Sequence, residues 1–127
     1  MRLSAKDVTI LLAHGLIGWG MCGAIVAIGR KTIGLETTLI VHAAAVPVVF
    51  GTLTWFYYRR FGKTRPSATA TVFLSLTLAL DAGVVAPFAE KGYAMFASLL
   101  GTWIPFALIF VSTLLTGVIM RKRTFTP

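Results

Sequence analysis

Four long runs of apolar residues constrain this chain more than any other feature of its sequence. The runs at residues 8–29, 38–58 and 96–120 contain no Asp, Glu, Lys or Arg, and the run at 67–88 contains one charged residue, Asp81. A helix needs about 20 mostly apolar residues to cross the hydrocarbon core of a bilayer. The sequence therefore predicts four transmembrane helices, one for each run.

The composition of the chain supports a membrane protein and excludes several other classes. The 127 residues are 57% hydrophobic and 13% charged, with a mean hydropathy of +0.84. An ordinary soluble domain is about 45–50% apolar and about 25% charged. These values exclude a disordered chain, a nucleic-acid-binding domain and a conventional soluble enzyme. The partner that they predict is the lipid bilayer, with no nucleic acid.

The connections between the predicted helices are short. They read RKTIGLE, RRFGKTRP and AEKG, so consecutive helices must run antiparallel and lie beside each other. The continuous apolar runs do not alternate as the strands of a membrane barrel do. We predict an all-α polytopic membrane protein, a single domain over residues 1–127 in which four helices form an up-down-up-down bundle.

The basic residues predict how the bundle is oriented. Nine of the 12 Lys and Arg residues lie on the side of the N-terminus, the second loop and the C-terminus, and three lie on the other side. Loops that carry excess Lys and Arg stay in the cytoplasm. Both termini are therefore expected to be cytoplasmic, in the inner membrane. The first run is longer than the apolar region of a cleavable signal peptide, which spans about 7–15 residues, so we expect it to be retained.

Small residues and prolines recur inside the predicted helices. Gly20 with Ala24 and Gly23 with Ala27 are spaced four apart, which permits close helix packing within the bundle or in a homo-oligomer. Three prolines, at positions 47, 87 and 105, fall within or near the ends of helices. Such prolines either kink a helix or break it where it lines a binding cavity.

Four of the polar residues inside the runs are the candidate site residues. An ionisable group within the membrane is costly and is expected to face the bundle interior with a partner. The helical rise places Asp81 about 5 Å and His42 about 10 Å to the external side of the membrane centre. These two form the predicted proton or cation site, and Thr77, one turn before Asp81, is a candidate donor to its carboxyl group. Alternatively, Asp81 is only a hydrogen-bonded tie between helices.

His14 is a secondary polar candidate at a different depth. It is expected about 6 Å to the cytoplasmic side of centre, about 16 Å from His42 along the membrane normal. Two histidines at such different heights are poorly placed to ligate one haem iron. The spans carry no HExxH, CxxC or Glu-x-x-His spacing for a metal. No metal, cofactor or catalytic residue is therefore predicted.

Three functions remain open from the sequence. The first is a small carrier or channel with a proton- or cation-sensitive Asp81–His42 pair. The second is a non-catalytic accessory subunit of a larger membrane complex, and the third is a membrane-embedded redox or lipid enzyme. A homo-oligomer or a larger membrane complex is the expected assembly, and an enzymatic role is the less favoured one because no catalytic motif is found in the sequence.

Overall fold

A computed structural model of the chain describes residues 4–62, 64–89, 91–92 and 94–125. Its main elements are helices, and no strand occurs among these residues. They are α1 (Ala5–Thr32), α2 (Leu35–Arg60), α3 (Pro66–Leu80) and α4 (Ile104–Phe125), joined between α3 and α4 by η1 (Asp81–Ala89), η2 (Ala94–Ala97) and η3 (Leu99–Trp103). Four segments are long and apolar enough to cross a membrane. The predicted all-α bundle of four transmembrane helices is confirmed.

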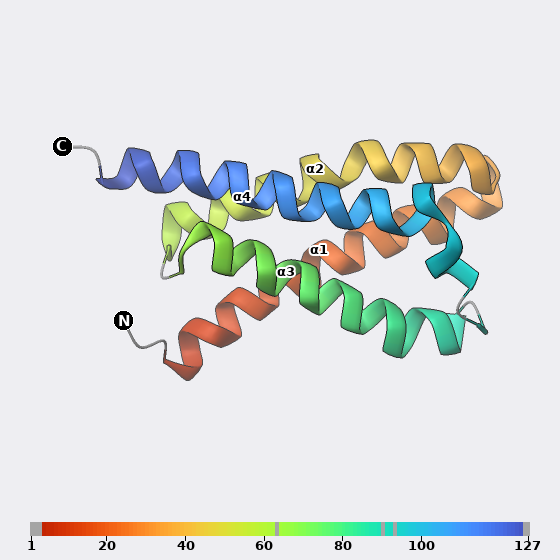
Figure 1. The fold of residues 1–127 in the computed structure, drawn as a ribbon, viewed down its shortest axis with the longest axis horizontal. Coiled ribbons are helices and arrows are strands. Elements are labelled where there is room, and N and C mark those ends of the chain that lie inside the picture. Colours follow the sequence, from red (N-terminus) through yellow and green to blue (C-terminus); the bar gives the residue numbers. More distant parts are fainter. Residues whose placement is uncertain (1–3, 63, 90, 93, 126–127) are drawn as a thin grey trace.

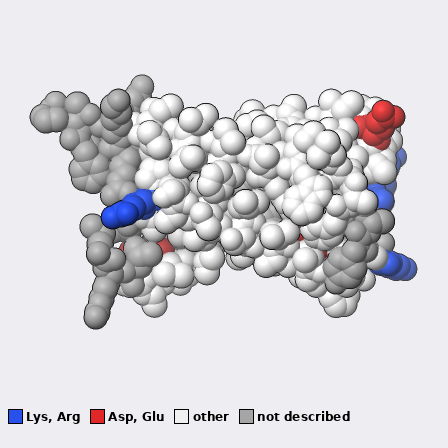
Figure 2. Space-filling model, viewed as in Figure 1, with Lys and Arg blue, Asp and Glu red and all other residues white. Residues whose placement is uncertain are grey.

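The long segments run antiparallel to their neighbours in the chain, and both termini lie at the same end of the bundle (Figure 1). α2 packs against α1 and α4, and α4 packs against α3 as well. In Figure 2 the Lys and Arg side chains lie at the two ends of the molecule, and the surface between them is almost entirely uncharged. An uncharged band of this kind fits the hydrocarbon core of a bilayer.

The first two helices begin and end at recognisable signals. Ser4 and Asp7 form a capping box at the start of α1, in which each side chain bonds to the backbone N–H of the other residue. α1 ends before Gly34, which has a φ of 85° and turns the chain into α2. Glycine suits this turn because it adopts a positive φ without steric cost. Both helices extend a few residues beyond the predicted spans.

The third and fourth segments are less regular than predicted. The α-helical geometry of α3 stops at Leu80, and η1 continues the segment as a π-helix from Asp81 to Ala89. A second short π-helix, η3, precedes α4. π-helical turns are rare and occur frequently at functional sites. The predicted helix at 67–88 is therefore divided into an α-helical and a π-helical part. The predicted helix at 96–120 begins with the end of the 3-10 helix η2 and the π-helix η3, and is α-helical only from Ile104.

α1 and α3 cross near the middle of the bundle and diverge toward the end that is opposite the termini (Figure 1). Glycines allow the close approach. A Cβ atom added at Gly15 would lie 2.7 Å from the Leu76 side chain, and one added at Gly18 would lie 2.8 Å from the Phe50 ring. The lack of a side chain at these positions brings α1 against both α2 and α3.

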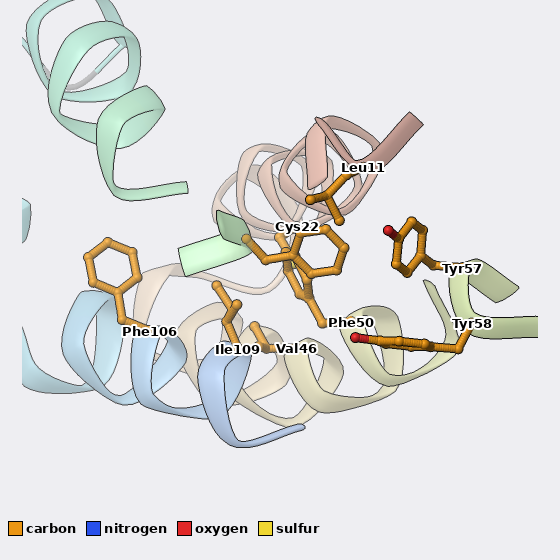
Figure 3. Packing of buried hydrophobic residues seen from close by; sticks show 9 residues of the cluster. Leu11, Cys22, Val46, Phe50, Tyr57, Tyr58, Phe106 and Ile109 are labelled. Atoms are coloured by element: carbon orange, nitrogen blue, oxygen red, sulfur yellow. The ribbon is translucent and has the colours of Figure 1, made fainter. Parts of the chain in front are cut away.

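The hydrophobic core follows this crossing. Its centre is formed by Phe50 of α2 and Phe73 of α3, both fully buried, with ring centroids 5.9 Å apart. Figure 3 shows Phe50 and Cys22 at the centre of the cluster and Phe106 at its edge. The core thus ends near Phe106, in the half of the bundle where α1 and α3 have diverged.

Hydroxyl groups tie the second loop to the end of the bundle that carries the termini. The Tyr58 hydroxyl donates to the backbone carbonyl of Thr64 at 2.8 Å and lies 2.7 Å from Oγ1 of Thr69. The Tyr57 hydroxyl lies 3.0 Å from Oγ1 of Thr64. All four residues are buried, so their polar groups satisfy one another and fix the turn between α2 and α3.

Candidate binding cavity

A cavity of about 940 Å³ lies in the half of the bundle that is opposite the termini. Its walls come from the second half of α1, the first half of α2, the end of α3, η1, η3 and the start of α4. Ligand sites in proteins are commonly clefts of about 300–1,000 Å³ lined mainly by apolar side chains. The volume therefore suits a small organic molecule.

Asp81 lies in the wall of this cavity at the junction of α3 and η1. Its Oδ1 atom accepts a hydrogen bond of 2.9 Å from the indole Nε1 of Trp19 in α1. Oδ2 has no hydrogen bond among the described residues. The carboxyl group is thus held in position by one oxygen, and the second oxygen remains for a ligand.

His42 and Thr77 line the same cavity, so the structure brings together three of the four predicted site residues. Both are buried, and within the described part of the chain neither Nδ1 of His42 nor Oγ1 of Thr77 has a hydrogen-bond partner. No hydrogen bond or ion pair between Asp81 and His42 is found among the described residues. The donor to the Asp81 carboxyl group is therefore Trp19, and not Thr77 as predicted.

The buried polar atoms that have no hydrogen-bond partner are informative about this cavity. Burying a polar group without a hydrogen bond costs about 1–3 kcal/mol in proteins, so most buried groups are paired. Three such atoms occur among the described residues, and two of them, Nδ1 of His42 and Oγ1 of Thr77, belong to residues that line the cavity together with Asp81. A bound ligand or ordered water that pairs with these atoms would remove the cost.

The small residues of α1 leave the space that forms the cavity. Gly20, Gly23, Ala24 and Ala27 all line it, and a Cβ atom added at Gly20 or Gly23 would meet no atom within 4 Å. Gly20 and Gly23 therefore do not pack closely against another helix of the bundle, so that alternative is wrong for them, and packing in a homo-oligomer stays a prediction. The glycines of α1 that pack closely against other helices lie on its other face, and they include Gly15 and Gly18.

The π-helical segments also line the cavity. η1 contributes Val84, Val85 and Phe88, and η3 contributes Gly101 and Thr102. Two of the three prolines lie beside them, since Pro87 is within η1 and Pro105 lines the cavity from the first turn of α4. The irregular helices thus occur where they line a cavity, which is the second of the two roles that the sequence left open for its prolines.

Aromatic rings supply much of the remaining wall. Trp19, Phe50, Phe88 and Phe106 all line the cavity, and the other lining residues are mainly aliphatic. Arg30 also lines it, but Arg30 is exposed and lies in the last turn of α1, eleven positions beyond Trp19. At 1.5 Å per residue this separation is about 16 Å along the helix. The cavity therefore has an acidic site within its apolar part and a basic residue at its outer rim.

His14 lies outside the cavity, toward the end of the bundle that carries the termini. Its Nδ1 atom is 2.8 Å from the backbone carbonyl oxygen of Ile10. Its ring packs edge-on against Tyr57 and Phe61, at centroid distances of 5.5 and 5.8 Å. These contacts give His14 a packing role between α1 and the end of α2, separate from the other predicted site residues.

Trp19 is the site residue that the sequence analysis missed. A tryptophan in the middle of an apolar helix is usually a packing residue, and its partner lies 62 positions away in the chain. The available signal was the need of a buried indole N–H for an acceptor. Among the described residues, no group of three His, Cys, Asp or Glu side chains is arranged to hold a metal.

Comparison of the chain with protein-family models, with curated proteins and with solved structures finds no match.

Proposed function

We propose that this small multi-pass membrane protein is a carrier or channel with a proton- or cation-sensitive site at Asp81. The observation that carries the proposal is the position of this residue. Asp81 is the one acid of the four apolar runs, its carboxyl group accepts a hydrogen bond from Trp19, and it lines a cavity that His42 and Thr77 also line. Intramembrane carboxyl groups of this kind mark ion and substrate pathways.

Asp81 and His42 have separate roles in this proposal. The carboxyl group binds the proton or cation through the oxygen that Trp19 does not occupy. The imidazole of His42 can accept and release a proton, as a proton relay requires. No direct hydrogen bond joins the two side chains in the described structure. In this proposal, a proton or ligand passes between them through the cavity that both of them line.

The orientation of the protein is part of the proposal. The bias of Lys and Arg toward the end with the termini supports a cytoplasmic location for both termini, in a cytoplasmic (inner) membrane. The cavity then belongs to the external half of the bundle. A ligand would enter from the outside or from the outer leaflet and reach the carboxyl group from there.

Reconstitution into proteoliposomes tests the proposal. The purified protein is expected to carry protons or cations under an imposed pH gradient or voltage, and Asp81→Asn is expected to lower that flux at least tenfold. A Gly83→Leu variant is the control, because Gly83 has no neighbour within 4 Å of an added Cβ and does not line the cavity. Absence of flux from correctly assembled wild-type protein would refute a transport role.

A further inference from the structure

We propose that the cavity binds an amphipathic organic cation, with its positive charge at Asp81 and its apolar body against the aromatic wall. This inference rests on the proposed function and names the class of substrate. Three properties of the cavity carry it: the volume, the chemistry of the walls and the position of the one acid.

The volume argues against a bare inorganic ion as the only occupant. A water molecule takes up about 30 Å³ in the liquid, whereas the cavity measures about 940 Å³. An ion and a few waters at Asp81 would fill a small part of this space. An organic molecule of drug size fills it far better.

The walls argue for an apolar body. Apart from the Asp81, His42 and Thr77 group and the rim, the lining is chiefly aliphatic and aromatic. Removing an apolar surface from water contributes about 25 cal/mol per Å². Trp19 lines the cavity and is hydrogen-bonded to Asp81, so it provides an aromatic ring beside the acid. Aromatic faces attract organic cations through their negative quadrupole.

The carboxyl group of Asp81 determines the sign of the charge that the ligand is expected to carry. Charges interact more strongly where the dielectric is low, so the half-buried carboxyl group of Asp81 dominates the inner part of the cavity. Arg30 is exposed at the rim, where water and salt screen it. A ligand that enters fully therefore meets a negative site, and its cation pairs with the free carboxylate oxygen.

Equilibrium dialysis of the detergent-solubilised protein tests which sign of ligand charge the cavity prefers. Tetraphenylphosphonium and tetraphenylborate have the same shape and opposite charges. The cation is expected to bind at least tenfold more tightly than the anion, and Asp81→Asn is expected to remove at least nine-tenths of this preference. Equal binding of the two ions, or an unchanged preference in Asp81→Asn, would overturn the proposal and point to occupancy by lipid or detergent.

A substitution that fills part of the cavity tests whether the cation binds there. Gly23→Leu places a large side chain in open space within the cavity and is expected to weaken binding of tetraphenylphosphonium at least tenfold. Gly83→Leu, also in open space but outside the cavity lining, is the matched control and is expected to keep wild-type affinity. Wild-type binding by Gly23→Leu would place the cation elsewhere and contradict the proposal.

The substrate class and the carrier role can fail separately. If proteoliposomes show an Asp81-dependent proton flux but the protein does not bind tetraphenylphosphonium, the substrate class is wrong and the carrier role stands. If the protein binds the cation in the cavity but neither cation nor proton flux is measured, the site stands and the carrier role is wrong.

Discussion

The indole Nε1 of Trp19 donates a hydrogen bond of 2.9 Å to Oδ1 of Asp81, which joins the first membrane-spanning segment to the third. This bond holds the carboxyl group in the cavity wall while leaving its second oxygen free. An acid placed in this way can act as an interhelical tie and as a binding group at once. The two interpretations that the sequence left open are therefore compatible.

A double-mutant cycle measures the Trp19–Asp81 bond. Trp19→Phe and Asp81→Ala are each expected to destabilise the protein, and their effects are expected to be less than additive because both remove the same bond. Interhelical hydrogen bonds in membrane proteins average about 0.6 kcal/mol and reach about 1.7 kcal/mol. Denaturant titration of the four proteins in mixed micelles gives the coupling energy, and strict additivity would show that the bond contributes nothing.

The two faces of α1 are expected to differ in their tolerance of added volume. Gly18→Ala places a methyl group 2.8 Å from the Phe50 ring, which is itself fully buried, and should cost about 1–3 kcal/mol through overpacking. Gly20→Ala meets no atom within 4 Å and should be neutral or slightly stabilising. Thermal unfolding in detergent compares the two variants, and equal losses would contradict the packing described here.

The two histidines are expected to contribute differently to the binding of an organic cation. Protons compete with the cation for Asp81, and a proton on His42 adds a positive charge to the cavity, so binding should weaken as the pH falls. The other ionisable groups in the wall are Cys22 and, at the rim, Arg30.

Substitutions separate the contributions of these groups. His42→Gln should reduce the pH dependence of tetraphenylphosphonium binding and Asp81→Asn should nearly abolish it. His14→Gln should leave it unchanged, because His14 lies outside the cavity. Binding isotherms at several pH values provide the measurement. An effect of His14→Gln as large as that of His42→Gln would contradict the assignment of the site.

The loop between α2 and α3 depends on the Tyr58 hydroxyl. Tyr58→Phe removes one bond to the Thr64 carbonyl and one contact with Thr69. The Thr64 carbonyl oxygen then loses its side-chain donor, whereas Oγ1 of Thr69 keeps its contact with Oγ1 of Thr64. We expect a loss of about 1–3 kcal/mol in the free energy of unfolding. Binding of tetraphenylphosphonium should be unaffected, because this cluster lies at the opposite end of the bundle from the cavity. A large loss of binding at unchanged stability would contradict that separation.

Much of the fold was predictable from the sequence because the partition of a helix into lipid depends on its own composition. Four apolar runs and three short loops determine the number of helices, their order and their antiparallel arrangement. Asp81, His42 and Thr77 could also be selected as candidates, since polar groups are rare in such runs. Each of these inferences needs only local sequence or helix length.

The inward face of each helix was not predictable in the same way. A soluble helix reveals its core-facing side by an apolar stripe, but a membrane helix is apolar all round. The sequence therefore did not distinguish Gly18, which packs against Phe50, from Gly20, which borders empty space. The partner of Asp81, the π-helical turns and the cavity all depend on how α1 and α3 cross and diverge. Only the tertiary structure decides these features, because they arise from contacts between segments far apart in the chain.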